Sequence, residues 1–186
     1  MVSFAEPARL SFIFDAEERE QWQKSSAILQ RMALQPEMVV ADVGAGTGYF
    51  SRLFAQILSA GRVHAIDSEP NMVTHMQQRF AREEWANVCV HLSQPSDPCL
   101  PVVPDWVFLA NVYRFIQERE TFLGRLFAQM GRQTRGLLVD FKGAQAAVSP
   151  TQARAEVQQA GFVVDELDLQ TCPDHYLLHF HKPAGE

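Results

Sequence analysis

The sequence lacks the features that mark secreted, disulfide-rich and membrane-spanning proteins. Cysteine is rare and odd in number, with three in 186 residues, which argues against a disulfide framework. The N-terminus has no basic stretch followed by an apolar one, as a secretory signal would have. The longest apolar stretch, 102–116, is interrupted by polar residues and is shorter than the ~20 residues of a membrane-spanning helix. We therefore expect a cytoplasmic protein with reduced thiols and no membrane insertion.

Basic residues are also few, since 16 Lys and Arg stand against 22 Asp and Glu, for a net charge of −6. Proteins that bind the phosphate backbone of nucleic acids usually present a basic stripe, so this balance argues against a nucleic-acid partner. Ten glycines and ten prolines are dispersed along the chain, which excludes collagen-like and low-complexity classes. No linker divides the sequence, and we expect one domain over residues 1–186.

Short apolar strands alternate with amphipathic helices, which is the pattern of an α/β protein with a mainly parallel sheet. Strands are expected at 38–43, 63–66, 88–92, 106–110, 137–141, about 162–169 and 175–181. Helices are expected at about 16–34, 50–58, 70–80, 118–130 and 150–160. The last two strands have no helix between them and should form an antiparallel hairpin. The predicted fold is a Rossmann-like, doubly wound, seven-stranded sheet, mainly parallel with a C-terminal antiparallel hairpin.

A glycine-rich loop follows the first predicted strand and precedes a helix. It reads Asp42-Val43-Gly44-Ala45-Gly46-Thr47-Gly48. Glycine lets the backbone approach a ligand closely, and a helix N-terminus offers free N–H groups. Asp67 ends the second predicted strand, nineteen residues past Gly48. In adjacent parallel strands its carboxylate faces the same crevice, where two acceptor oxygens suit the paired hydroxyls of a ribose.

The loop distinguishes between nucleotide cofactors. A dinucleotide fingerprint would place its third glycine at position 49, where this chain has Tyr49. The absence of a Gly-Lys-Ser/Thr sequence after the loop excludes a P-loop. Asp42 precedes the first glycine by two residues and would oppose a pyrophosphate, but it suits a ligand that carries an ammonium or a sulfonium. These residues favour S-adenosylmethionine over NAD.

With these motifs the sequence resembles the class I S-adenosylmethionine-dependent methyltransferases, in particular small bacterial members akin to the ubiquinone/menaquinone-biosynthesis type. The resemblance extends from about residue 22 to 182. It rests on segments in the order and spacing of the family, at 40–50, 65–72, 95–101, 109–113 and 140–142. What it implies is a core over residues 36–182, preceded by an N-terminal helix and lid segment over residues 1–35.

The resemblance also implies which residues surround the cofactor. They are Asp42, Gly44, Ala45, Gly46, Thr47 and Gly48 at the methionine half, Asp67 with Ser68 at the ribose, Ser96 and Asp97 at the adenine, and Asn111 beneath the transferring methyl group. Tyr113 and Arg114 are the candidates for a catalytic role. Close relatives often carry His where this chain has Arg114, and Arg stays protonated and cannot act as a base. The Ser-Asp-Pro sequence around Asp97 is also typical of an ordinary turn, and Tyr113 of a core residue.

The predicted function is transfer of the methyl group of S-adenosylmethionine to a small-molecule acceptor. Such a transfer is an in-line displacement, so the protein contributes mainly alignment and water exclusion. The alternatives are a catalytically silent protein of the same fold that acts as a cofactor sensor or partner subunit, and, disfavoured by Tyr49, an NAD-linked reductase.

Two further features of the sequence call for an interpretation. His175, His179 and His181 share one face of the last predicted strand, but residues two apart lie ~7 Å apart along a strand. We therefore expect a packed or solvated face rather than a metal site. The apolar cluster at 10–14 is costly to leave in water, and we expect residues 1–21 to form a lid over the crevice. The alternative is a brace on the far side of the sheet.

Overall fold

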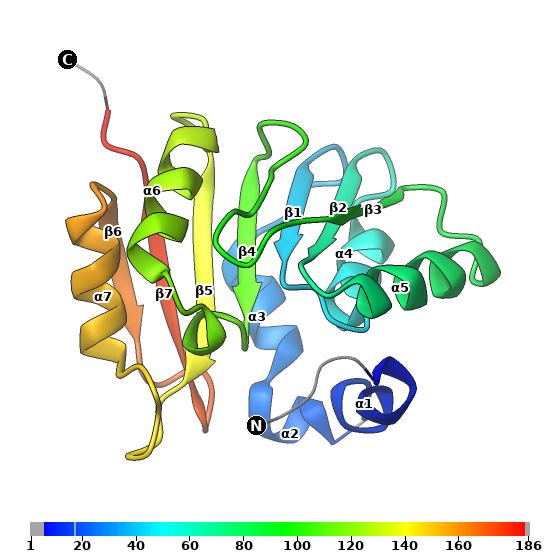
Figure 1. Cartoon of the computed structure of the whole chain (residues 1–186), viewed down its shortest axis with the longest axis horizontal. Helices are drawn as coiled ribbons and strands as arrows, with labels where there is room; N and C mark the ends of the chain where they lie inside the picture. The colour runs from blue at the N-terminus through cyan, green and yellow to red at the C-terminus, as the bar shows by residue number, and fades with distance from the viewer. Residues whose placement is uncertain (1–5, 17, 185–186) are drawn as a thin grey trace.

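The computed structural model describes residues 6–16 and 18–184, and its centre is one seven-stranded sheet in the order β3-β2-β1-β4-β5-β7-β6 (Figure 1). The strands are β1 (Val39–Val43), β2 (Arg62–Asp67), β3 (Val88–Leu92), β4 (Trp106–Ala110), β5 (Arg135–Phe141), β6 (Val163–Asp168) and β7 (His175–His181). Strands β1 to β5 pair in parallel, and β7 runs antiparallel to both β5 and β6. The predicted fold class is therefore confirmed, and the strand bounds agree with the sequence-based ones to within two residues.

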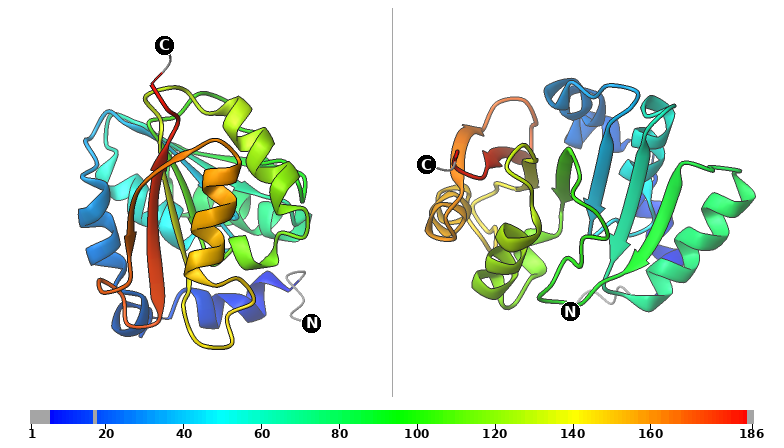
Figure 2. Two further views of the ribbon diagram at one scale, coloured as in Figure 1. Left: turned by 90° about the vertical axis from the view of Figure 1, so that its left-hand side faces the viewer. Right: turned by 90° about the horizontal axis from the view of Figure 1, so that it is seen from above.

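Helices cover both faces of the sheet, as Figure 2 shows. On one face lie α3 (Ser25–Met32) and α4 (Tyr49–Ile57), and on the opposite face lie α6 (Arg119–Gln129) and α7 (Pro150–Gln159), while α5 (Pro70–Arg82) packs on β2 and β3. The apolar residues of α4 recur at helical spacing, so that Phe50 and Phe54 both meet Phe108 of β4, with ring centroids 4.7 and 5.1 Å apart. Each such buried side chain stabilises the fold by roughly 1.5–3 kcal/mol.

The single helix expected at about 16–34 is wrong, because the chain turns sharply at Lys24. That residue has a left-handed backbone with φ of 55° and separates α2 (Arg19–Gln23) from α3. The carboxylate of Glu20 accepts hydrogen bonds from the backbone N–H and the hydroxyl of Ser26. This side chain therefore satisfies a free donor at the start of α3 and stabilises the turn. As a result α3 lies on the sheet, whereas α2 leaves it.

The N-terminal segment lies beyond the carboxyl ends of the parallel strands (Figure 1). It contains α1 (Pro7–Phe14), which begins with a proline at its first turn, and α2. The sequence predicted an apolar cluster here that would be buried. Leu10 is buried, but Phe12 and Ile13 are 83% and 60% exposed, so for these two residues that expectation is wrong. None of the helices in the described ranges is long and apolar enough to cross a membrane.

Candidate functional site

The glycine loop between β1 and α4 has the backbone that only glycine adopts readily. Gly44, Gly46 and Gly48 have φ of 75°, 60° and 86°, values that strain residues with a side chain. A Cβ atom on Gly44 would lie 2.2 Å from Val112, and one on Gly48 would lie 2.6 Å from Phe80. These two glycines are therefore required by packing inside the protein. A Cβ atom on Gly46 would meet nothing nearer than Phe14, at 3.7 Å, so it would clash with no other part of the protein.

Asp67, the last residue of β2, is fixed beside this loop. Its Oδ2 atom accepts a hydrogen bond from the backbone N–H of Gly46 at 2.8 Å, and its Oδ1 atom accepts one from the N–H of Glu69 at 2.9 Å. Burial raises the pKa of this carboxyl above its ordinary value, and the backbone donors oppose that rise. Each carboxylate oxygen has a second lone pair, so the side chain can still accept hydrogen bonds from a ligand.

Asp42 lies beneath the loop rather than on its surface. The side chain is buried, and its Oδ2 atom accepts a hydrogen bond from the Ser51 hydroxyl at 2.6 Å. Burial raises the pKa of this carboxyl to about 7, although the bond from Ser51 and the charge of Arg19 both lower it. Asp42 does not line the cavity beside the loop, so its side chain is separated from that cavity by the loop itself.

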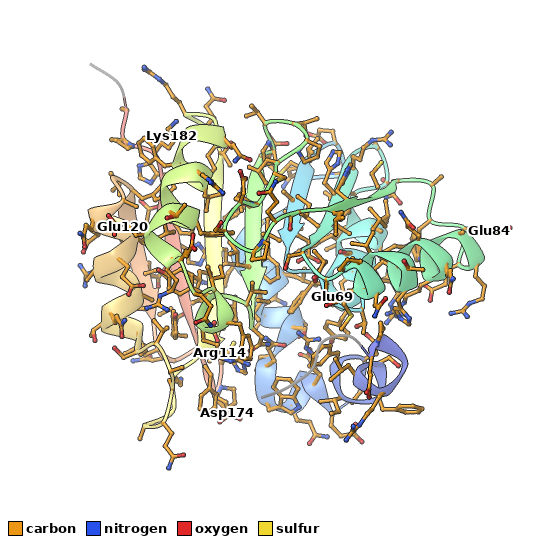
Figure 3. All side chains as sticks on the ribbon, viewed as in Figure 1. Glu69, Glu84, Arg114, Glu120, Asp174 and Lys182 are labelled. Carbon is orange, nitrogen blue, oxygen red and sulfur yellow. The ribbon has the colours of Figure 1, made fainter. Side chains whose placement is uncertain are left out.

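A cavity of about 610 Å³ opens at the carboxyl ends of the strands, next to the loop. Most of the residues predicted to bind the cofactor line it, namely Gly44, Ala45, Gly46, Thr47, Asp67, Ser68 and Asn111. Arg114, one of the two predicted catalytic residues, also lines it. Figure 3 shows Arg114 and Asp174, which lines the cavity too, at the same end of the molecule, whereas Lys182 lies at the opposite end.

Four of the predicted cofactor-binding residues do not line this cavity: Asp42, Gly48, Ser96 and Asp97. Ser96 and Asp97 instead contact α6. The carbonyl and hydroxyl oxygens of Ser96 accept hydrogen bonds from Arg125, and Asp97 Oδ1 accepts one from Gln129 at 2.8 Å. The neighbouring Pro95 does line the cavity, so the loop approaches the cavity through a different residue from the ones predicted.

Tyr113, the other predicted catalytic residue, faces away from the cavity. It follows β4 in the short helix η1 (Tyr113–Phe115) and is fully buried. Its hydroxyl donates a hydrogen bond to Glu156 of α7 at 2.6 Å, and burial raises the pKa of the phenol. Arg119 donates to the same carboxylate. The structure therefore places Tyr113 in a contact between helices rather than with the glycine loop.

The half of the cavity away from the glycine loop contains a polar network around Asn111. The Asn111 Oδ1 atom accepts a hydrogen bond from Arg114 Nη1 at 3.0 Å and lies 2.8 Å from His175 Nε2. Arg114 also pairs with the buried carboxylate of Asp140. Because Asn111 Oδ1 can only accept, His175 Nε2 carries the proton and Nδ1 carries a lone pair. That Nδ1 atom is buried and has no partner in the described part of the chain.

His175 is held neutral by its surroundings. Trp22 of α2 stacks on the imidazole with ring centroids 5.6 Å apart, and Phe141 meets it edge-on at 6.1 Å. Burial, together with the nearby charge of Arg114, lowers the pKa of His175 to about 4. A neutral imidazole with a free lone pair can accept a hydrogen bond.

The three histidines of β7, His175, His179 and His181, lie in different environments. His179 packs edge-on against Trp106, and His181 lies 2.9 Å from the carboxylate of Asp165. In the described residues no group of three or more His, Cys, Asp and Glu side chains is arranged to hold a metal ion. Only His175 of the three reaches the cavity with the glycine loop.

The segments α1 and α2 cover the cavity and are joined to the glycine loop. Leu10, Phe14, Arg19 and Trp22 from these helices line it. Asp15 accepts a hydrogen bond from the Thr47 hydroxyl at 3.0 Å, and Arg79 of α5 donates to Asp15 and to the Thr47 carbonyl, each at 2.9 Å. The described part of the predicted lid, residues 6–16 and 18–21, therefore lies at the crevice, and residues 1–5 and 17 lie outside the described residues.

Arg19, Trp22 and His175 are the cavity residues that the sequence analysis missed. The sequence contained a signal for His175. A strand that runs antiparallel to the others begins at the edge of the sheet where the parallel strands end, so its first residue lies at the same edge as the glycine loop. The register pairs His175 with Phe141, the last residue of β5. Arg19 and Trp22 gave no such signal, since their position depends on the left-handed turn at Lys24.

Comparisons with known proteins agree with this geometry. A family model described as a methyltransferase domain matches residues 40–136. Over 113 residues the chain is 26% identical to trans-aconitate 2-methyltransferase of Delftia acidovorans, covering 60% of this chain and 41% of that protein. Over 70 residues it is 40% identical to ribosomal RNA small subunit methyltransferase A of a Synechococcus species, covering 34% and 24%. The chain thus spans less than half the length of these two curated relatives.

A solved structure of similar size shares the fold. The crystal structure of an S-adenosylmethionine-dependent methyltransferase from Aquifex aeolicus superposes with a TM-score of 0.83 at 21% sequence identity. The match covers 94% of this chain and 97% of that one. It therefore extends over nearly the whole length of both chains.

Proposed function

The chain belongs to the methyltransferase domain family, and we propose that it transfers the methyl group of S-adenosylmethionine to a small-molecule acceptor. The observation that carries this proposal is the single cavity in which the glycine loop and Asp67 meet Asn111 and His175 under a roof of two helices. The loop side has the features of a cofactor site, and the other side has polar and aromatic groups that suit an acceptor.

The loop side of the cavity fits the cofactor. A Cβ atom added to Gly46 would clash with no other part of the protein, so a ligand can lie against the backbone there. The carboxylate of Asp67 is positioned to accept hydrogen bonds from ribose hydroxyls. The buried charge of Asp42 favours a sulfonium or ammonium above the loop. S-adenosylmethionine would supply a methyl carbon that its sulfonium already activates.

The other side of the cavity fits an acceptor with a hydroxyl or amine. The His175 ring lines this side with Nε2 bonded to Asn111, and it lies beside the acceptor as a neutral polar group rather than as a base, because its pKa is lowered to about 4. Arg114 is paired with Asp140 and acts as a positioning residue for Asn111. The helices α1 and α2 exclude water, which strengthens these contacts and protects the reacting groups. Tyr113 has no role in this proposal, since it faces Glu156.

A small acceptor is supported by the size of the cavity and by its cover. About 610 Å³ is within the range of small-molecule sites. The relative from Delftia acidovorans is named for a small acid. The relative from Synechococcus is named for ribosomal RNA, but the net charge of −6 argues against a nucleic-acid acceptor for this chain. A cytoplasmic location is part of the proposal and is supported by the free thiols of Cys89, Cys99 and Cys172.

Calorimetric titration and a release assay test the proposal. We expect the protein to bind S-adenosylmethionine and S-adenosylhomocysteine but not NADH. In a screen of small acids, phenols and amines, with ribosomal RNA as a separate arm, we expect S-adenosylhomocysteine release with a small acceptor. Release with RNA alone would contradict the small-molecule acceptor. Binding without release in any arm would favour the catalytically silent alternative, and binding of NADH would contradict the cofactor.

A further inference from the structure

Arg19 is a buried cation that lines the cavity and forms no ion pair with a carboxylate of the described residues, although the charges of Asp15 and Asp42 act on it from beyond ion-pairing distance. It is 6% exposed, and its guanidinium carbon lies 4.1 Å from the ring centroid of Tyr49 and 4.9 Å from that of Phe50. Its Nη1 atom donates a hydrogen bond to the Phe14 carbonyl at 2.6 Å, and its Nε atom donates to the side chain of Gln23. Both acceptors are neutral. In residues 6–16 and 18–184 no carboxylate lies within ion-pairing distance of it.

This arrangement differs from that of the other partly or fully buried arginines near the site. Arg79 pairs with Asp15, Arg114 with Asp140, and Arg119 with Glu156. A buried charge without a partner is costly, and aromatic faces and carbonyl dipoles compensate only part of that cost. Burial lowers the pKa of Arg19 to about 10, so the guanidinium is a cation at neutral pH. A ligand that brings a negative charge to it would therefore be bound strongly.

The chemistry of the guanidinium selects the kind of anion. Its planar fork of N–H donors matches the two oxygens of a carboxylate, which it binds through parallel hydrogen bonds. In the described part of the chain the Nη2 atom donates to no protein acceptor, and Arg19 is part of the cavity wall. The side chain therefore has donors to offer from the direction of the ligand.

Arg19 lies between the two halves of the cavity. On one side it covers Tyr49 and Phe50, the first residues after the glycine loop. On the other side its guanidinium carbon is 5.8 Å from the ring of Trp22, which stacks on His175. From this position Arg19 can contact a carboxylate on the methionine part of the cofactor or a carboxylate on the acceptor.

We propose that Arg19 is the binding residue for a carboxylate of a ligand in the cavity. The inference rests on the proposed function and deepens it, because it adds a specific contact from the lid to the ligand. Since Arg19 belongs to α2, binding the carboxylate also holds this helix over the cavity. The source of the carboxylate is either the methionine group of the cofactor or the acceptor.

The experiment compares wild type, Arg19→Gln and Arg19→Lys by titration with S-adenosylhomocysteine and with 5′-methylthioadenosine, which lacks the amino-acid group. If the cofactor supplies the carboxylate, Arg19→Gln binds S-adenosylhomocysteine about 10–100-fold more weakly and 5′-methylthioadenosine as wild type does. Arg19→Lys keeps the charge and should recover part of the loss. If the acceptor supplies the carboxylate, both nucleosides bind Arg19→Gln as they bind wild type. In the presence of saturating S-adenosylhomocysteine, trans-aconitate then binds the variant more weakly than it binds wild type. The trimethyl ester of trans-aconitate, which has no free carboxylate, has the same affinity for both proteins.

The matched control is Arg9→Gln, which makes the same change on α1, where the side chain is 83% exposed, and should alter no affinity. Arg19→Gln overturns the inference if it leaves all of these affinities unchanged. It also overturns the inference if it weakens the two nucleosides equally, because that would indicate a structural role. A wild-type protein that binds neither nucleoside would overturn the proposed function itself, and the inference with it.

Discussion

Asp15 and Thr47 are joined by a hydrogen bond of 3.0 Å between the last residue before the α1–α2 turn and the middle of the glycine loop. The same carboxylate pairs with Arg79 of α5 at 2.9 Å, so one acidic side chain ties the segment above the cavity both to the glycine loop and to α5. If this segment is the lid that we propose, a change at Asp15 should alter how the cavity retains a ligand.

Asp15→Asn should loosen the lid without unfolding the domain. Asn loses the charge that pairs with Arg79 but fills the same space. We expect S-adenosylhomocysteine to dissociate about 5-fold faster, the scale of one lost hydrogen bond, with a nearly unchanged melting temperature in the absence of ligand. Stopped-flow fluorescence of Trp22 offers the measurement.

Deletion of residues 2–14 tests the lid more severely. A lid predicts a folded domain with impaired cofactor retention and methyl transfer. If the truncated protein melts at a lower temperature but binds the cofactor normally, the segment is a brace and the lid proposal is wrong.

Asp67→Ala should weaken S-adenosylhomocysteine binding by ~1.5–3 kcal/mol, the scale of hydrogen bonds to a charged group. The variant also leaves the N–H groups of Gly46 and Glu69 without their acceptor, so a modest loss of thermal stability should accompany it. Calorimetry measures the affinity. The control is Asp97→Ala, which removes a carboxylate outside the cavity. An equal loss of affinity in the control would restore the predicted contact between Asp97 and the adenine.

Gly46→Val should abolish cofactor binding, whereas Gly124→Ala should not affect it. At Gly46 the backbone φ of 60° strains a β-branched residue, whose side chain would also fill ligand space. At Gly124, in the middle of α6, an added Cβ atom meets nothing within 4 Å. We expect the helix to gain roughly 0.5–1 kcal/mol there. Normal cofactor binding by a folded Gly46→Val variant would show that the loop is not the cofactor site.

Asp42→Asn should make stability less dependent on pH. The pKa of Asp42 is about 7 in the folded protein and near 3.9 in an unfolded chain, so folding favours the protonated carboxyl. The stability that this preference adds is fully present below pH 3.9 and is lost as the pH rises from there to 7. The stability of the variant relative to wild type should therefore increase by about 1–3 kcal/mol between pH 5 and pH 8.5. Urea titrations at the two pH values measure it, and a constant difference would refute the assignment.

His175→Gln should have the opposite effect over a similar pH range. The pKa of His175 is about 4 in the folded protein and about 6.5 when unfolded, so folding favours the neutral ring. The stability it contributes is present above pH 6.5 and is lost as the pH falls toward 4. The variant should lose less stability on acidification than wild type, while His64, whose pKa is also about 4, accounts for a remaining loss. An identical acid profile in the two proteins would contradict a buried neutral His175.

The sheet and the glycine loop could be predicted because their signals are local. Each strand is a short apolar run. The loop needs glycine at positions 44 and 48, because a Cβ atom at either position would clash with a neighbouring side chain. The missing helix between the last two strands correctly predicted that they pair as an antiparallel hairpin.

The remainder of the candidate site depends on contacts between distant segments. The split at Lys24 is stabilised by the side chain of Glu20, and no periodicity of apolar residues reports it. The direction of Tyr113 is decided by its bond to Glu156, 43 positions away. The exposure of Phe12 also depends on distant segments, because an apolar residue on a short helix is buried only where another part of the protein packs against it.

The part of the cavity wall that Trp22 and His175 form together has a consequence for when in synthesis the cavity is completed. Cys172 donates a hydrogen bond to the carbonyl of Gln23, a residue 149 positions earlier in the chain, so the second half of the cavity joins the beginning of the chain to its final hairpin. A chain still emerging from the ribosome after β5 has the glycine loop and Asp67, but α2 lacks the contacts of Trp22 with His175 and of Gln23 with Cys172. Contacts of such long range close late in folding. The cavity that we propose as the active site is therefore completed only with the last strand.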